Sequence, residues 1–94
     1  MKLIEILRRG DIAEDEQATI YVARPWSPEA DAIVVSPAPA ATGPVEQNGR
    51  TFDYFLEGFL AHEFLEDLVA SGEFEGASEK QLCERLIRYA EADA

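Results

Sequence analysis

The chain contains one histidine and one cysteine, so any Ser-His or Cys-His catalytic pair would have to use His62 or Cys83. Cys83 precedes Glu84 and has no adjacent lysine or arginine, a setting that disfavours the thiolate required for nucleophilic chemistry. Its position beside the apolar stripe of a predicted helix is typical of a small core side chain. We therefore expect Cys83 to be structural, and keep an enzyme built on His62 or Cys83 as a second alternative.

Metal binding would start from His62 and Glu66, which are four residues apart and share one face of a predicted helix. Glu63 and Asp67 add carboxylate oxygens nearby, but a specific site needs at least three converging ligands, and no second set with suitable spacing follows. The metalloprotease pattern requires a second histidine at the position that Glu66 occupies. We therefore expect no metal and no cofactor. A single cysteine also excludes an intramolecular disulfide and a Cys-rich zinc site.

Carboxylates are plentiful, but glycosidase-type acid–base chemistry needs two of them across a cleft, one of which lies in an apolar wall. A domain of 94 residues has little room for such a cleft. The glycines are scattered and lack the Lys-Ser/Thr sequel of a phosphate-binding loop. The sequence therefore predicts a protein that is not an enzyme.

Negative charge is the property that most distinguishes the composition. Nineteen acidic residues against eight lysines and arginines give a net charge of −11. This balance argues against binding to nucleic acid phosphates and against docking on anionic membranes. From residue 51 to residue 79 there is no lysine or arginine, but there are eight acids: Asp53, Glu57, Glu63, Glu66, Asp67, Glu73, Glu75 and Glu79. Such a field favours a partner protein with a basic surface, although acidic surfaces also keep small proteins dispersed.

The predicted partner-binding surface combines carboxylates with two aromatic anchors, and its members are Glu63, Glu66, Asp67, Glu73, Phe74, Glu75 and Trp26. Phe74 is flanked by acids on both sides, which favours partial exposure. Trp26 lies between two prolines after a predicted strand. A large aromatic there either is an exposed anchor or folds back to cap one end of the core.

The elements that position these residues begin with a short amphipathic helix over 2–9, for which Gly10 is the predicted left-handed cap. Residues 11–17 lack periodicity and are expected to form an acidic connector. Residues 19–24 and 31–36 are rich in β-branched side chains and are predicted strands, the second of them buried on both faces.

Proline is dense in residues 36–44, which predicts a mobile Pro/Ala-rich loop within one domain. Asn48-Gly49 then predicts a two-residue hairpin that pairs 45–47 with 50–52. The alternation that follows favours a strand to position 57, whereas a helix from 51 to 70 is the competing interpretation. Gly58 favours the first interpretation, a strand before it and a helix after it, because a glycine inside a helix destabilises that helix by about 1 kcal/mol relative to alanine.

Two helices complete the predicted fold. The first begins at Phe59, ends at Ser71-Gly72, and has a predicted buried stripe of Leu60, Phe64, Leu65 and Leu68, with His62 and the acids pointing away. Ser78 and Gln81 form a capping box that opens the second, whose predicted core side chains are Leu82, Leu86, Ile87 and Ala90. We therefore expect one α+β domain over 1–94, with an antiparallel sheet of two to four strands packed with three helices in the order helix, strands, helix, helix.

No apolar run in the chain approaches the length of about 20 residues that a membrane span needs. The apolar stretch at the N-terminus is too short to be the core of a signal peptide. With no export signal and one thiol, the cytoplasm is the expected compartment.

Residues 54–67 (YFLEGFLAHEFLED) and the tail 86–93 (LIRYAEAD) resemble small acidic bacterial domains of unknown function, some of which are similar to immunity proteins encoded beside polymorphic toxins. The resemblance implies a stoichiometric binder. We therefore expect a non-catalytic, acidic protein-binding domain, an immunity-like inhibitor of a basic partner. The alternative is a homo-oligomeric structural subunit, for example a homodimer formed through the sheet edge or the last helix.

Overall fold

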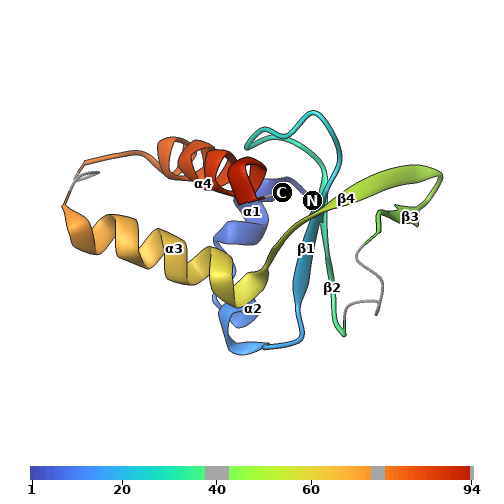
Figure 1. The fold of residues 1–94 in the computed structure, drawn as a ribbon, viewed down its shortest axis with the longest axis horizontal. Coiled ribbons are helices and arrows are strands. Elements are labelled where there is room, and N and C mark those ends of the chain that lie inside the picture. The colour runs from blue at the N-terminus through green and yellow to red at the C-terminus, as the bar shows by residue number, and fades with distance from the viewer. Residues whose placement is uncertain (38–42, 73–75, 94) are drawn as a thin grey trace.

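The computed structural model describes residues 1–37, 43–72 and 76–93. Within these ranges the helices and strands follow the order α1 (Leu3–Leu7), α2 (Asp11–Glu14), β1 (Thr19–Val22), β2 (Ala32–Val35), β3 (Val45–Gln47), β4 (Arg50–Glu57), α3 (Gly58–Ser71) and α4 (Glu79–Asp93). Figure 1 shows the sheet at one end and α3 and α4 extending from it. The predicted α+β class is confirmed, with α2 as an additional turn of helix. Most of the predicted mobile loop, 38–42, lies outside the described residues.

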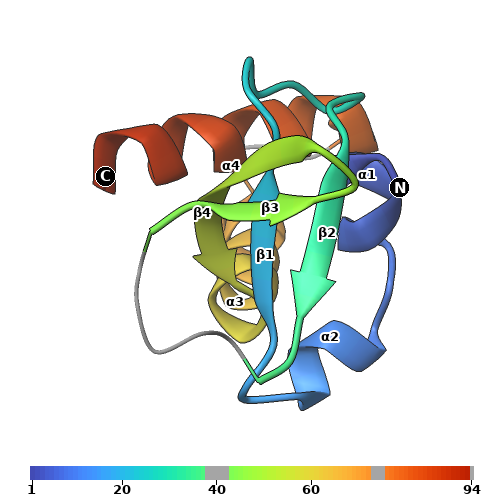
Figure 2. The same ribbon diagram turned by 90° about the vertical axis from the view of Figure 1, so that its right-hand side faces the viewer.

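The sheet is antiparallel throughout and has the strand order β2-β1-β4-β3. Every residue of the central strand β1 is buried. The pairing of β1 with β4 shifts register between Ile20 and Tyr21, and such an irregularity increases local twist. Figure 2 shows the β3–β4 hairpin curling across the face of β1 and β2 that the long helices do not cover. Both faces of β1 are thereby shielded from water.

The hairpin forms as its turn residues predict. Asn48 and Gly49 have positive φ angles of 54° and 76°, which the two-residue turn requires. Val45 pairs with Phe52 and Gln47 with Arg50, so the predicted register is confirmed. The strand interpretation of the following segment is confirmed as well, because β4 continues to Glu57 and α3 begins at Gly58.

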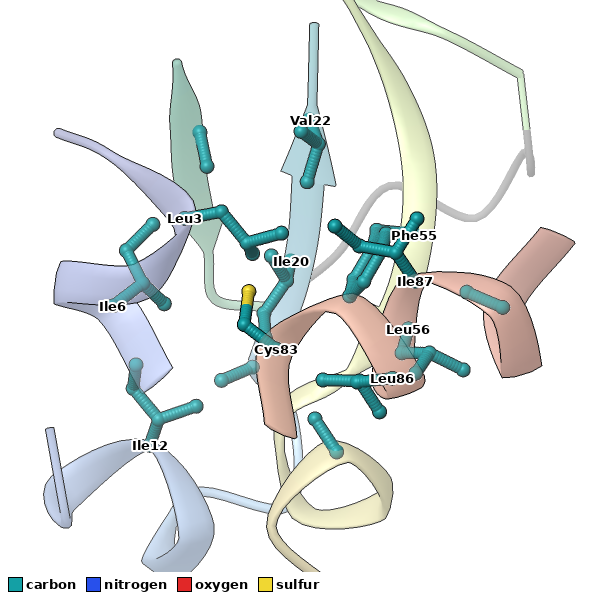
Figure 3. Close-up of a cluster of buried hydrophobic side chains, with 14 residues drawn as sticks. Leu3, Ile6, Ile12, Ile20, Val22, Phe55, Leu56, Cys83, Leu86 and Ile87 are labelled. Atoms are coloured by element: carbon teal, nitrogen blue, oxygen red, sulfur yellow. The ribbon is translucent and has the colours of Figure 1, made fainter. Parts of the chain in front are cut away.

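The main core lies between the sheet and the helices, and Figure 3 shows its labelled side chains converging from α1, α2 and α4 and from β1 and β4. A smaller cluster of Tyr21, Ala23 and Phe52 packs on the opposite face, under the hairpin. The prediction that the second strand is buried on both faces is correct only for Ala32, because β2 is an edge strand whose later residues are half-buried. The amide of Ala32 donates to the carbonyl of Met1 at 2.7 Å, so the N-terminus covers part of that edge.

Two predictions for the N-terminal region are wrong. Gly10 has a φ of −69° and precedes α2, so it is not a left-handed cap. The supposed acidic connector contains the helical turn α2, and Ile12 within it is 2% exposed. Ile12 is buried against the main core, and this contact stabilises the helical turn. The charged residues around it show no periodic pattern that could have predicted the turn.

The predicted buried stripe of α3 is only partly correct, since Phe64 and Leu65 pack against the main core without being fully buried. The buried residues of α3 are Gly58 and Ala61, whereas Leu60, Phe64, Leu65 and Leu68 are half-buried. Figure 1 shows that α3 extends away from the sheet, so its outer half lies beyond the strands. The predicted end of α3 and the predicted start of α4 are both confirmed. Gly72 caps the end of α3 with a φ of 77°. Ser78 and Gln81 form the capping box at the start of α4, with two backbone–side-chain hydrogen bonds of 2.8 and 3.2 Å.

Gly58 is the point at which α2 approaches the start of α3. A Cβ at this position would overlap Cγ2 of Ile12 and lie 3.0 Å from the Ile12 carbonyl oxygen. We therefore expect Gly58→Ala to lower the free energy of unfolding by about 1–3 kcal/mol, although helix propensity alone predicts a gain. Urea unfolding followed by circular dichroism measures this change.

Gly43→Ala is the matched control, because a Cβ there has no atom within 4 Å and its φ is not positive. We expect this variant to be neutral or to gain up to about 1 kcal/mol. A Gly58→Ala protein as stable as the wild type would show that α2 does not pack tightly on α3.

Candidate functional site

The exposed carboxylates of α3 form one surface, which we call the α3 acidic face: Glu63, Glu66 and Asp67. Their spacing of three and four residues places them on one side of the helix, away from the buried Gly58 and Ala61. None of the three takes part in an ion pair with any residue that the structure describes. Their negative charge is therefore directed at solvent.

Ion pairs elsewhere neutralise other acids of the chain. They join Arg8 to Glu79 at 2.9 Å, Arg9 to Asp11 at 2.8 Å, Arg24 to Asp53 at 3.1 Å, and Arg50 to Asp31. The hydrogen bond and the charge of Glu79 raise the pKa of Arg8. All four pairs are solvent-exposed, so each stabilises the fold only weakly. Their placement nevertheless leaves the α3 acidic face without a counter-charge from the described part of the chain.

His62 belongs to the packing between helices, and the prediction that it points away from the fold is wrong. It is half-buried, and its Nε2 lies 3.0 Å from the carbonyl oxygen of Arg9. Because a carbonyl oxygen only accepts, Nε2 carries a proton and donates this hydrogen bond. The contact ties α3 to the junction of α1 and α2, and it engages one of the two ring nitrogens.

Cys83 is 1% exposed, and Figure 3 shows its sulfur pointing from α4 into the main core. The expected structural position of this thiol is confirmed. Burial raises the pKa of Cys83 to about 12, and the nearby carboxylates of Glu29 and Glu84 act in the same direction. The thiol is therefore protonated at neutral pH.

This pKa predicts an unreactive thiol in the folded protein. At pH 8 about one molecule in 10⁴ carries the thiolate, so we expect iodoacetamide to alkylate Cys83 at least about 100-fold more slowly than in the urea-unfolded chain. Mass spectrometry of timed samples measures both rates. Equal rates in the folded and unfolded proteins would show that Cys83 is accessible and ionisable.

Trp26 folds back to cap one end of the core, which is one of the two positions that its sequence context predicts. Its Nε1 donates to the carbonyl of Val22 at 3.1 Å, and its ring packs edge-to-face on Phe55 with centroids 5.1 Å apart. The guanidinium carbon of Arg24 lies 3.7 Å from the ring centroid. The indole is thus half-buried between the core and a cation. A contact of Trp26 with a partner stays a prediction.

The remaining predicted site residues, Glu73, Phe74 and Glu75, lie outside the described residues, and their role stays a prediction. Within the ranges that the structure covers, no group of three or more His, Cys, Asp or Glu side chains is arranged to hold a metal ion. The described helices include none with the length and apolar character needed to cross a membrane.

A feature absent from the sequence-based prediction is a groove of about 110 Å³ where α1, α3 and α4 meet. Its lining consists of Ile4, Leu7, Leu65, Glu79, Leu82 and Cys83. These side chains come from three helices that are far apart in the sequence, so no local pattern indicates the groove. The stacked rings of Phe64 and Tyr89, with centroids 4.5 Å apart, add a second contact between α3 and α4.

The α3 acidic face and the groove, which lies on the other side of α3, are therefore the two features that stand out chemically. The first can attract positive charge and the second can bury an apolar group, and both are features of a binding surface. Comparison with known protein families, curated proteins and solved structures finds no match to the chain, so the resemblance to immunity-type proteins stays a prediction.

Proposed function

We propose that this protein is a non-catalytic binding domain whose α3 acidic face docks on the basic surface of a partner protein. The observation that carries the proposal is the exposure of Glu63, Glu66 and Asp67, with no ion pair to any described residue. Unpaired charges of one sign attract a partner of opposite sign over long range and help to select it. The net charge of −11 strengthens that attraction.

An immunity-like inhibitor is the form of binding domain that we propose. Carboxylates held on a helix occupy a basic cleft in the way that phosphates do, so the domain would block a cleft such as the phosphate-binding site of a nuclease. Inhibition would then be steric and electrostatic and would require one copy of the domain for each partner. The single, buried thiol supports a cytoplasmic site of action as part of this proposal.

Affinity capture from the native cell tests the proposal. The wild-type protein is expected to retain a basic protein that the triple variant Glu63→Lys, Glu66→Lys, Asp67→Lys does not retain. The matched control is Glu16→Lys, Glu46→Lys, Glu91→Lys, which changes the same number of exposed acids away from α3. Equal capture by the wild type and both variants would contradict docking through the α3 acidic face.

A homo-oligomer is the second candidate, and one observation favours it. Lys80, Arg85 and Arg88 are exposed on α4 and form no ion pair with any other described residue. These cations are complementary in charge to the α3 acidic face of a second copy. Sedimentation at micromolar concentration separates the two candidates, since a monomer excludes self-assembly as the main role.

A further inference from the structure

The edge strand β2 is covered along only the first part of its outer edge. There the amide of Ala32 donates to the carbonyl of Met1 at 2.7 Å. Lys2 and Asp31 form an antiparallel bridge at the same place, so the N-terminal segment already pairs with β2 as a short strand. Past Met1, the outer edge has no strand partner in the part of the chain that the structure describes.

The register of the sheet shows which backbone groups of β2 this leaves open. The carbonyl of Asp31 accepts from the amide of Ala23 on the side of β1, whereas the amide of Ala32 points outward. Backbone groups alternate in direction along an antiparallel strand, so those of Ile33 face β1 and those of Val34 face outward. The amide and the carbonyl of Val34 have no hydrogen-bond partner among the described residues.

A hollow of about 250 Å³ lies beside this open part of β2. Ile6 and Arg9 line it on the side of the helices, and Gln47 lines it on the side of the hairpin, which Figure 2 shows crossing β2. Ile33 and Val34 also line it and are half-buried. The hollow therefore leaves space for a further strand next to Val34.

The chemistry of this edge identifies its ligand as an extended backbone. An outward amide and carbonyl on one residue are the groups that a neighbouring strand pairs with. Residues 32–35 (AIVV) contain no charged side chain, proline or bulge, which are the usual means of protecting an edge. Ile33 packs on the small cluster and Val34 on the main core, so an added strand would meet apolar surface on both faces.

A second copy of this chain does not fit the same edge. Two-fold pairing centred on Val34 would place the bend that follows β2 in one copy opposite Ala32 of the other, where Met1 already lies. A shift that avoids Met1 would pair residues beyond Val35, where β2 has ended. Each copy also carries a net charge of −11, so the two copies would repel each other.

We propose that the open part of the β2 edge binds an extended segment of a partner protein, which joins the sheet as an additional strand paired with the backbone of Val34. The segment would carry β-branched or other aliphatic side chains at alternate positions, and no proline at the residue that pairs with Val34. The inference goes beyond the proposed function, because this site lies on the sheet and is independent of the α3 acidic face.

Amide hydrogen exchange measured by NMR tests the inference without any substitution. In the free protein we expect the amide of Val34 to exchange at least about 100-fold faster than that of Ile33, which bonds to β1. The probe is a short end-capped peptide in which threonine and valine alternate between one lysine and one glutamate, so that it has no net charge. When about nine-tenths of the protein is bound, exchange at Val34 should slow about tenfold. The same peptide N-methylated at two adjacent central residues, which blocks both of its edges, should have no effect.

Val34→Pro removes the outward amide and leaves the hydrogen bonds between β1 and β2 in place. We expect it to weaken peptide binding about tenfold or more, because a carbonyl of the incoming strand loses its donor. Glu46→Pro is the matched control, since the hairpin register directs the amide of Glu46 away from β4 at the opposite edge of the sheet. It should bind the peptide like the wild type. Circular dichroism verifies that both variants are folded, and if Val34→Pro is not, the exchange of the wild-type amides decides.

Three outcomes would overturn the inference. Unchanged exchange at Val34 in millimolar peptide would show that the edge does not accept a strand. Loss of binding in Glu46→Pro but not in Val34→Pro would place the strand on β3. A wild type that sediments as a dimer, and a Val34→Pro variant that sediments as a monomer, would show that a second copy occupies the edge. The α3 triple lysine variant should bind the peptide like the wild type, so affinity capture decides the proposed function separately.

Discussion

Reversing all three charges of the α3 acidic face is expected to slow association with the basic partner by about 10- to 1000-fold at low salt. Glu63→Lys, Glu66→Lys and Asp67→Lys replace attraction by repulsion at the surface where the partner first makes contact. Exposed charges act mainly on the association rate, so the dissociation rate should change less. Surface plasmon resonance with the captured partner measures both rates.

Net charge alone also steers association, and the control variant separates it from local recognition. Glu16→Lys, Glu46→Lys, Glu91→Lys changes the net charge by the same amount, from −11 to −11 + 6 = −5. Its association rate should fall clearly less than that of the α3 variant, because these carboxylates lie outside α3. Equal decreases would mean that the partner responds to the overall field and that α3 is not the contact surface.

Phe55→Ala is expected to produce the largest loss of stability, about 3–5 kcal/mol. Phe55 is 2% exposed in the main core and supports the ring of Trp26 at a centroid distance of 5.1 Å. A chain of 94 residues has a free energy of unfolding of roughly 5–14 kcal/mol, so this one truncation removes a large share of it. Urea unfolding monitored by the fluorescence of Trp26 and by circular dichroism measures the loss.

Tyr54→Ala is the matched control on the same strand. Tyr54 is 38% exposed on the opposite side of β4 and contacts Tyr21 edge-to-face at 6.1 Å. Its truncation should cost clearly less than that of Phe55, because less apolar area is lost and no closed cavity remains. Similar losses for the two variants would contradict the assignment of the main core to the helical side of the sheet.

The parts of the fold that could be predicted are those set by local chemistry. Asn48-Gly49 demands positive φ angles and thereby determines both the turn and the register of β3 and β4. Ser78 and Gln81 satisfy the backbone donors at the start of α4, and Gly72 supplies the left-handed cap of α3. In each case the residues that decide the structure are neighbours in sequence.

The parts that could not be predicted depend on contacts between distant segments. Ile12 is buried because it meets Gly58, so the composition of residues 11–17 could not indicate a helical turn. The leucines of α3 fit a buried stripe by periodicity, yet the helix extends away from the sheet and leaves them half-buried.

The candidate site likewise has a part that could be predicted from local sequence and a part that could not. The exposure of Glu63, Glu66 and Asp67 follows from helical periodicity, because these residues lie opposite Gly58 and Ala61. The groove on the other side of α3 depends on how three helices meet, and the inward position of His62 depends on the carbonyl group of Arg9, which lies between α1 and α2. Tertiary packing creates both features.

The most direct measurement for the central claim is the salt dependence of partner affinity. Exposed charges are screened beyond about 10 Å at 0.1 M salt and at shorter distances as salt rises. We predict that the dissociation constant of the wild type increases steadily between about 0.1 and 0.5 M sodium chloride, and that the α3 triple lysine variant loses this dependence. A wild-type affinity that stays constant over the same range would contradict recognition through the α3 acidic face.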